Sequence, residues 1–182
     1  TNKVKKQELQ PLNGIIPDYE FNLVHNGSIP NTEKHDTQFI NREIMRQQYT
    51  MSMERRLICL MMNVPAAYSL LVLTPDALYA VRDRYGIRPL CIGKDATNYY
   101  VSSESCAFED HIDFIRDVKP GEIVKITKKG IKSVFIHPNA QNSLCSFEIL
   151  YFLSPHSYVD GMQIRTIREN LGTILAKKEN II

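Results

Sequence analysis

The stretch "FNLVHNGSI", Phe21 to Ile29, decides how this sequence is interpreted. Apolar residues and one Asn lead into His25, Asn26 and Gly27, and the chain then turns polar. An Asn-Gly pair is typical of a tight turn, because both residues tolerate a positive φ. The local pattern therefore predicts a short strand over Tyr19–Val24 with a turn after it.

The composition is that of an ordinary soluble globular protein, with 43% hydrophobic and 23% charged residues among 182. A chain of this length can bury one substantial core, or one domain and part of another. The net charge of +2 is too small to indicate nucleic acid or an anionic membrane surface as a partner. No apolar run approaches the roughly twenty residues of a membrane span, and no secretory segment is seen near the start.

The chain has four cysteines and five histidines, none with metal-type spacing. Because no C-x-x-C pair is present, the cysteines fit neither a zinc module nor a compact disulfide scaffold. Reduced thiols in a cytoplasmic protein are the expectation. The four cysteines are Cys59, Cys91, Cys106 and Cys145.

Apolar spacing predicts two helices early in the chain, one from Asp36, capped by Asp36 or Thr37, and one over Met53–Asn63. Runs rich in β-branched and aromatic residues then predict antiparallel strands, and a third amphipathic helix covers Met162–Lys178. Helices followed by antiparallel strands favour an α+β fold over alternating parallel units. The strands are expected at Ala67–Thr74, Ala77–Asp83, Leu90–Lys94, Asn98–Ser105 and, as a hairpin, Glu122–Ile136.

The segment "AVRDRYGIRPLCIG", Ala80 to Gly93, is the second informative stretch. It places Arg82 and Asp83 at a strand end, Gly86 in a turn, and Arg88 at the start of the next strand. One interpretation is a hairpin whose Arg and Asp pair across the turn. The other is a corner that faces a ligand, although no phosphate-binding glycine pattern is present.

The segment "VSSESCAF", Val101 to Phe108, lacks the glycines that a nucleophile elbow needs around its serine. Ser102 or Ser103 is expected to cap the following turn, with Glu104 in its first turn. Cys106 has no basic neighbour in sequence that would lower its pKa, so a packing thiol is the expectation.

Taken together, these stretches resemble the amidophosphoribosyltransferase family of class II glutamine amidotransferases, the enzymes with an N-terminal nucleophile. The resemblance covers most of the chain from about Leu9 onward. The matching segments are "HNGSI" (25–29), "HDTQ" (35–38), "AAYSLLVL" (66–73), "YAVRDRYGIRPLCIG" (79–93), "YVSSESCAF" (100–108), "FIRDVKPGEIVKI" (114–126), "CSFEILYFLSP" (145–155) and "IRTIRENLGTILA" (164–176).

The resemblance implies a glutaminase site. In the family, an N-terminal cysteine attacks the side-chain amide of glutamine, and its own α-amine carries the proton. The side-chain NH₂ of Asn26 and the main-chain N–H of Gly27 would then stabilise the oxyanion of the tetrahedral intermediate. Loss of one such donor typically costs roughly 3–4 kcal/mol of barrier. Asp36 would hold the α-ammonium group of glutamine.

Other residues receive supporting roles from the resemblance. Arg82, Asp83, Gly86 and Arg88 would shape a corner of the glutaminase sheet, with Ser103 and Glu104 in a second structural motif. Cys145 is a candidate ligand of a [4Fe–4S] cluster that some family members bind, with a plain thiol as the alternative.

The family's ammonia passes to a Mg²⁺-dependent phosphoribosyltransferase domain, where phosphoribosylpyrophosphate becomes phosphoribosylamine, the first step of de novo purine synthesis. The implied fold is a four-layer αββα sandwich. Residues 1–157 would form the glutaminase domain without its N-terminal part, and 158–182 the first helix of the α/β transferase domain. A homo-oligomer in the cytoplasm is implied as well.

The sequence departs from the family in ways that leave alternatives open. A catalytic cysteine and an Arg-Tyr motif are expected upstream of this stretch, and Thr1 lies in a polar loop that does not suit a nucleophile. A helix usual between Asn31 and Thr32 is missing, and Arg84 replaces a proline. We expect the 182 residues alone to be inactive. The alternatives are a truncated, non-catalytic interaction protein and the glutaminase domain of another class II amidotransferase.

Overall fold

The computed structural model of the chain describes residues 9–30 and 35–179. They fall into two compact units. The first unit is drawn from Thr1–Arg88 and Val118–Ser143, and the second from Pro89–Asp117 and Leu144–Ile182. The departure expected between Asn31 and Thr32 lies outside the described residues.

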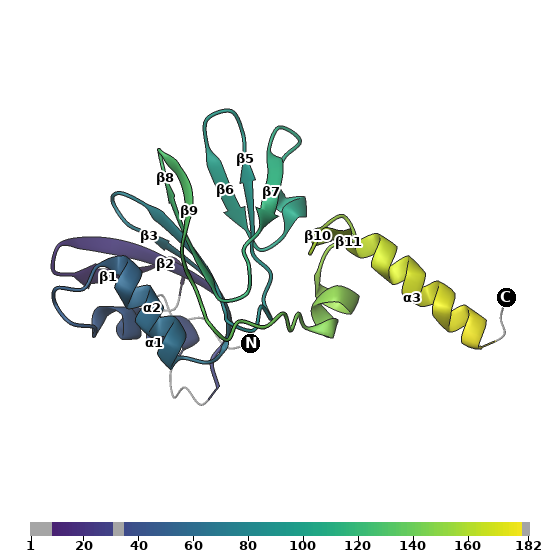
Figure 1. Ribbon diagram of the computed structural model, residues 1–182, viewed down its shortest axis with the longest axis horizontal. Helices are drawn as coiled ribbons and strands as arrows, with labels where there is room; N and C mark the ends of the chain where they lie inside the picture. Colours follow the sequence, from purple (N-terminus) through teal and green to yellow (C-terminus); the bar gives the residue numbers. More distant parts are fainter. Residues whose placement is uncertain (1–8, 31–34, 180–182) are drawn as a thin grey trace. The chain divides into compact units, whose positions relative to one another are not determined.

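The first unit contains a six-stranded antiparallel sheet with the strand order β1-β2-β3-β4-β8-β9 (Figure 1). The strands expected at Ala67–Thr74 and Ala77–Asp83 and the hairpin expected over Glu122–Ile136 are present, and the turn of the hairpin is Lys128-Lys129. The strands are β1 (Leu12–Ile16), β2 (Tyr19–Ser28), β3 (Ala67–Leu73), β4 (Leu78–Arg82), β8 (Glu122–Thr127) and β9 (Gly130–Ile136).

Two helices pack on one face of this sheet, α1 (Asp36–Met45) and α2 (Met53–Asn63) (Figure 1). Apolar side chains of both helices meet alternate residues of the strands in one core cluster. Because side chains alternate along a strand, the residues between them face away from the helices. The core includes Phe21, Leu23, Leu70 and Val72 from the sheet, and Ile40, Ile44, Leu57 and Leu60 from the helices.

The two helices begin differently. Ser52 caps α2, since its hydroxyl oxygen accepts a hydrogen bond from the Arg55 N–H at 3.4 Å. The expected cap of α1 by Asp36 or Thr37 is wrong, because His35 occupies the N-cap position and Asp36 is the first helical residue. The Asp36 carboxylate instead accepts from a main-chain N–H beyond β2, described below.

A buried arginine closes the loop between the helices. Arg56 is fully buried, and its guanidinium donates to main-chain carbonyl oxygens of the last turn of α1 and the loop after it. Three of the shortest bonds reach Met51 (2.9 Å), Ile44 (3.0 Å) and Gln48 (3.0 Å). A cation at the C-terminal end of a helix also interacts favourably with the helix dipole.

The second unit contains a three-stranded antiparallel sheet with the order β6-β5-β7, followed by mostly helical chain. A small core of Leu153, Val159 and Ile164 joins the segment before residue 157 to the start of α3. Its elements are β5 (Cys91–Lys94), β6 (Tyr99–Ser102), β7 (Asp113–Asp117), a 3₁₀ turn (Ser105–Ala107), a π-helix (Glu148–Phe152), β10 (Tyr158–Val159), β11 (Met162–Gln163) and α3 (Ile164–Lys178).

The expected α+β class is confirmed by these elements. The division at 157/158 stays a prediction. Within the described ranges, no helix has the length and apolar content that crossing a bilayer requires.

Candidate functional site

The segment His25-Asn26-Gly27 is part of β2, and the predicted turn is wrong. Asn26 pairs with Ser69 and Gly27 with Tyr68 of β3, and Gly27 is not among the glycines with positive φ. Pairing with β3 along the whole of Ala67–Leu73 therefore outweighs the local turn preference of Asn-Gly. The result is a ten-residue strand, Tyr19–Ser28.

Gly27 is required by close packing rather than by its φ angle. A Cβ atom at this position would lie 2.2 Å from the Ala67 carbonyl oxygen and 2.7 Å from the Tyr68 Cα. It would also lie 2.8 Å from Nε2 of His25. Because the first two of these atoms are main chain, any larger residue would displace β3.

The main-chain N–H of Gly27 points to the outer edge of β2, away from β3. Opposite Gly27, the main chain of Tyr68 bonds toward Asp83, with its N–H on the Asp83 carboxylate (3.3 Å) and its C=O accepting from the Asp83 N–H (2.9 Å). Gly27 and Tyr68 are therefore a non-hydrogen-bonded pair of the antiparallel ladder. On the outer edge, two residues earlier, the Gln10 side chain binds the main chain of His25.

The Asp36 side chain binds the main chain at the C-terminal end of the same edge. Its Oδ2 accepts a hydrogen bond from the Ile29 N–H at 3.0 Å. The N–H groups of His25, Gly27 and Ile29 therefore lie in a row along this edge. The His25 N–H donates to the Gln10 carboxamide, and the Ile29 N–H donates to the Asp36 carboxylate. The middle donor belongs to the residue that the family resemblance assigns to the oxyanion hole.

The Asn26 side chain is exposed on the sheet face opposite α1 and α2. Register places Asn26, Ser69 and Arg82 side by side across β2, β3 and β4 on this face. The Ser69 hydroxyl donates to the Arg88 carbonyl oxygen at 3.4 Å. The His-Asn-Gly segment and the Arg-Asp segment, far apart in sequence, therefore meet in one row of the first unit.

The His25 imidazole is half-buried on the helix-facing side of the sheet, opposite to the Asn26 side. Its Nδ1 lies 3.3 Å from the Thr37 hydroxyl oxygen, and its Nε2 has no hydrogen-bond partner among the described residues. Burial lowers the pKa of His25, and the nearby Arg88 charge lowers it further while Asp36 opposes both. The ring is therefore mainly neutral at pH 7. The sequence did not assign a role to the side chains of His25 or Gln10, and it predicted Thr37 only as a helix cap.

The Arg82–Arg88 segment is a corner held by main-chain contacts. The buried Arg82 guanidinium donates to the carbonyl oxygens of Arg88 (2.8 Å), Val118 (2.8 Å) and Gly86 (2.9 Å). Gly86 has φ +61°, and an added Cβ would meet the Pro120 ring at 2.6 Å. These contacts fix the shape of the corner, and its expected role in a glutaminase sheet stays a prediction.

Asp83 is fully buried and organises the same corner. Its carboxylate accepts from the main-chain N–H groups of Tyr85 (2.9 Å), Ile87 (3.1 Å), Arg88 (3.3 Å) and Tyr68. Burial raises the pKa of this carboxyl, while these donors act in the opposite direction.

Glu104 binds a segment about fifty residues further along the second unit. Its Oε2 accepts from the Ser154 N–H and from the Ser157 hydroxyl, both at 2.7 Å. The expected place of Glu104 in the first turn is wrong, because it precedes the 3₁₀ turn at the N-cap position. Ser102 supplies the local contact, accepting from the Glu104 N–H at 3.3 Å, and Ser103 is half-buried between them.

Cys145 is half-buried and its thiol is free. Among residues 9–30 and 35–179, no three His, Cys, Asp or Glu side chains are grouped to hold a metal ion. The described residues therefore offer no complete ligand set for an iron–sulfur cluster, and Cys145 as a cluster ligand stays a prediction.

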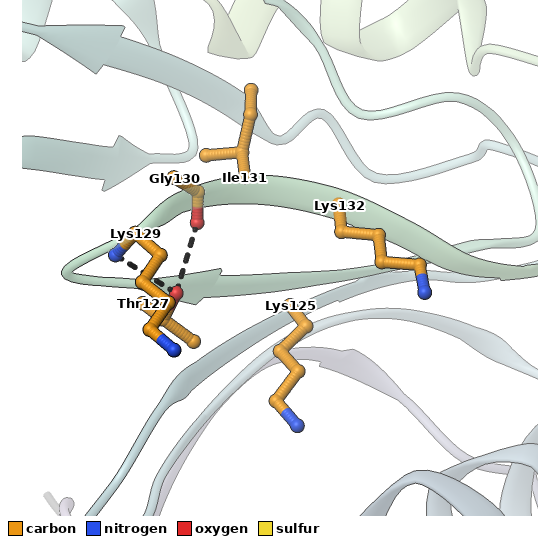
Figure 2. Close-up of a pocket in the computed structure, with 6 residues that line it drawn as sticks. All are labelled: Lys125, Thr127, Lys129, Gly130, Ile131 and Lys132. Carbon is orange, nitrogen blue, oxygen red and sulfur yellow. Dashed lines mark hydrogen bonds between the residues drawn. The ribbon is translucent and has the colours of Figure 1, made fainter.

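A hollow of about 230 Å³ lies at the β8–β9 hairpin. Figure 2 shows Lys125, Lys129 and Lys132 extending to one side of the hairpin, with Ile131 on the other. Lys125 is already paired with Glu54 at 2.7 Å, and the other lysines are solvated. Because neither Asn26, Gly27 nor Asp36 lines it, this hollow is separate from the candidate site.

Comparison with known proteins defines the class. A family model described as a glutamine amidotransferase domain matches residues 3–110, so the chain belongs to the glutamine amidotransferase domain family. Within this class it is a class II domain related to amidophosphoribosyltransferase, as the resemblance predicts. The amidophosphoribosyltransferase of Methanocaldococcus jannaschii is 37% identical over 131 residues, which cover 63% of this chain and 28% of that protein. That of Rattus norvegicus is 38% identical over 136 residues, covering 64% of this chain and 26% of that one.

Solved structures show the same relationship. Glutamine phosphoribosylpyrophosphate amidotransferase from Bacillus subtilis, complexed with ADP and GMP, superposes with a TM-score of 0.84 at 30% identity. The match covers 95% of this chain and 42% of that one. The α+β fold of the N-terminal-nucleophile amidotransferase type is thereby confirmed. The chain spans between 24% and 28% of the length of the curated relatives it matches.

Proposed function

We propose that this chain supplies the oxyanion-binding side of the glutaminase site of a glutamine-dependent amidophosphoribosyltransferase. The observation that carries the proposal is the edge of β2. There the Gly27 N–H lies between His25, held by Gln10, and Ile29, held by Asp36. A donor fixed by its neighbours on a rigid strand needs no reorganisation when negative charge develops nearby.

In the proposed reaction a cysteine thiolate, from outside the four cysteines of this sequence, attacks the glutamine amide. The carbonyl oxygen becomes an oxyanion, and the Gly27 N–H with the Asn26 carboxamide NH₂ would bind it. Asn26 is exposed on the face of the sheet away from the helices, where it is accessible to a substrate. Loss of one such donor would cost roughly 3–4 kcal/mol of transition-state stabilisation.

Asp36 would bind the α-ammonium group of glutamine by a charge-assisted hydrogen bond. The bond between its Oδ2 and the Ile29 N–H ties the carboxylate to the strand that carries Gly27. This contact supports the proposal because it joins the α1 residue proposed to bind the substrate to the end of the strand that carries the proposed oxyanion donor. A direct contact between the two elements restricts the distance between the two functions.

The transfer step is proposed from the relatives alone. Ammonia would displace pyrophosphate from phosphoribosylpyrophosphate to give phosphoribosylamine, and Mg²⁺ would neutralise the pyrophosphate charge. The relatives extend well beyond the part that this chain matches. We therefore assign this step to a phosphoribosyltransferase domain that begins with residues 158–182, in a cytoplasmic homo-oligomer.

The test uses the full-length natural protein that carries this sequence. Intact mass and N-terminal sequencing would show whether an N-terminal cysteine is present, and glutamine hydrolysis is then measured with and without phosphoribosylpyrophosphate. We expect hydrolysis, and covalent labelling of the N-terminal cysteine by a thiol-reactive glutamine analogue. A mass equal to that of these 182 residues, with no turnover, would instead support a non-catalytic interaction protein. Turnover coupled to another acceptor would indicate a different class II amidotransferase.

A further inference from the structure

The Gln10 side chain takes the place of a strand neighbour beside β2. In the β1–β2 ladder Leu12 stands opposite Leu23, so the same register continued would place Gln10 opposite His25. At this rung the bonds come from the Gln10 side chain. Its Oε1 accepts from the His25 N–H at 2.5 Å, and its Nε2 donates to the His25 carbonyl oxygen at 2.9 Å.

A side-chain amide has one peptide group's donor and acceptor, so it can form the pair of hydrogen bonds at only one position of the ladder. A main-chain strand that continued in register would pair with His25 and then with Gly27, because alternate residues of a strand bond to the same side. Pairing at Gly27 would consume the N–H that the oxyanion requires. The Gln10 side chain therefore closes the β2 edge at His25 without itself occupying the Gly27 donor.

The same carboxamide also reaches the start of α1. Gln10 Nε2 lies 3.3 Å from the Thr37 hydroxyl oxygen, which is also 3.3 Å from Nδ1 of His25. Thr37 is buried and follows Asp36 in the chain. One side chain therefore connects the strand that carries Asn26 and Gly27 with the helix turn that carries Asp36.

We propose that Gln10 is a positioning residue of the glutaminase site, which holds the β2 edge at His25 and sets Gly27 relative to Asp36. The inference rests on the proposed function of these residues. Gln10 itself touches the main chain of His25 and the side chain of Thr37, and is not proposed to touch glutamine.

Two substitutions separate the contributions of Gln10. Gln10→Met keeps the shape of the side chain and removes both the donor and the acceptor. Gln10→Glu keeps an acceptor for the His25 N–H but presents a carboxylate to the His25 carbonyl and removes the donor to Thr37. The matched control is Gln47→Met, because the Gln47 carboxamide also donates to a main-chain carbonyl, that of Glu43, at 3.2 Å.

The first measurement is amide hydrogen exchange of the full-length protein, resolved at His25. We expect Gln10→Met to accelerate exchange of the His25 amide by about tenfold or more, because the pairing that protects it is lost. Gln10→Glu should give a smaller effect, and Gln47→Met should leave the His25 amide unchanged. An unchanged His25 exchange rate in Gln10→Met would overturn the inference whatever the activity.

The second measurement is steady-state glutamine hydrolysis by the same variants. We expect Gln10→Met to lower kcat about tenfold to a hundredfold, with a smaller change in KM, since displaced donors act mainly in the transition state. A fall in kcat no larger than that of Gln47→Met would refute the positioning role. A wild-type protein without glutaminase activity would overturn the proposed function. That result is distinguishable from failure of the positioning role, because the exchange rate of the His25 amide is measured independently of activity.

Discussion

Oδ2 of Asp36 lies 3.0 Å from the main-chain nitrogen of Ile29, two residues beyond Gly27 on the same strand edge. This contact joins the first turn of α1 to the end of β2. It holds the carboxylate proposed to bind the substrate ammonium against the end of the strand that carries the proposed oxyanion donor.

Substitution of Asn26 should affect catalysis without affecting stability. The side chain is exposed, so Asn26→Ala should change the free energy of unfolding by less than about 0.5 kcal/mol. In the full-length protein it should lower kcat for glutamine hydrolysis by about 10²–10³-fold, because one oxyanion donor is lost. The control is Asn22→Ala, an exposed asparagine on the same strand and face. Equal loss of activity in the two variants would argue against an oxyanion role for Asn26.

Substitution of Gly27 should destabilise the first unit. The added methyl of Gly27→Ala would lie 2.2 Å from the Ala67 carbonyl oxygen, so β2 and β3 must separate. We expect a loss of about 1–3 kcal/mol in the free energy of unfolding, measured by denaturant titration. Gly172→Ala is the matched control, because an added methyl there has no atom within 4 Å and lies in α3. It should stabilise the helix by up to about 1 kcal/mol. A Gly27→Ala protein as stable as wild type would contradict the close approach of β2 and β3.

Arg56 should be essential for the connection between α1 and α2. Arg56→Lys retains the charge but cannot reach the several carbonyl oxygens that the planar guanidinium binds. Because each bond to a charged group contributes about 1.5–3 kcal/mol, we expect a loss of at least about 3 kcal/mol. Arg55→Lys, on the exposed side of the same helix, should have almost no effect. Thermal unfolding of the two variants side by side tests this difference.

Acidification should weaken the fold through His25. Burial lowers the pKa of His25 in the folded protein below its ordinary value of 6.5, and the same holds for the buried His137. The unfolded chain therefore binds protons at a higher pH than the folded one does. The stability contributed by these rings is complete above pH 6.5 and is lost as the pH falls through the folded-state pKa.

NMR titration of the imidazole signals should show midpoints for His25 and His137 below 6.5. His25→Gln should reduce the dependence of unfolding free energy on pH below 6.5, with the His137 contribution retained. A His25 midpoint at or above 6.5 would contradict the burial of the ring.

Local pattern predicted much of the fold. The apolar spacing of α1 and α2 and the β-branched runs of β3, β4 and β8 match their elements closely, because burial repeats with a fixed period along each element. The motif "RDRYGIRP" was expected to shape a corner of the glutaminase sheet. Arg82 and Asp83 bind main-chain groups of the same segment, and the role in a glutaminase stays a prediction. The resemblance to a glutamine amidotransferase also came from sequence alone, and the family match confirms it.

Other features depended on which distant segments meet. Asn26-Gly27 has the local preference of a turn, but pairing with Tyr68 and Ser69 keeps it in β2. Nothing near Gln10 in sequence indicates that its carboxamide would bind His25, fifteen residues away. Glu104 likewise finds its partners at Ser154 and Ser157.

The sequence by itself determined the class of protein and the elements with a regular apolar period. Only the tertiary structure decided the β2 edge, with Gln10 at one end, Asp36 at the other and the Gly27 N–H between them. The physical reason is that hydrogen bonds between side chains and main chain act over a few ångströms in space. Residues reach that distance only after the sheet and its helices have assembled.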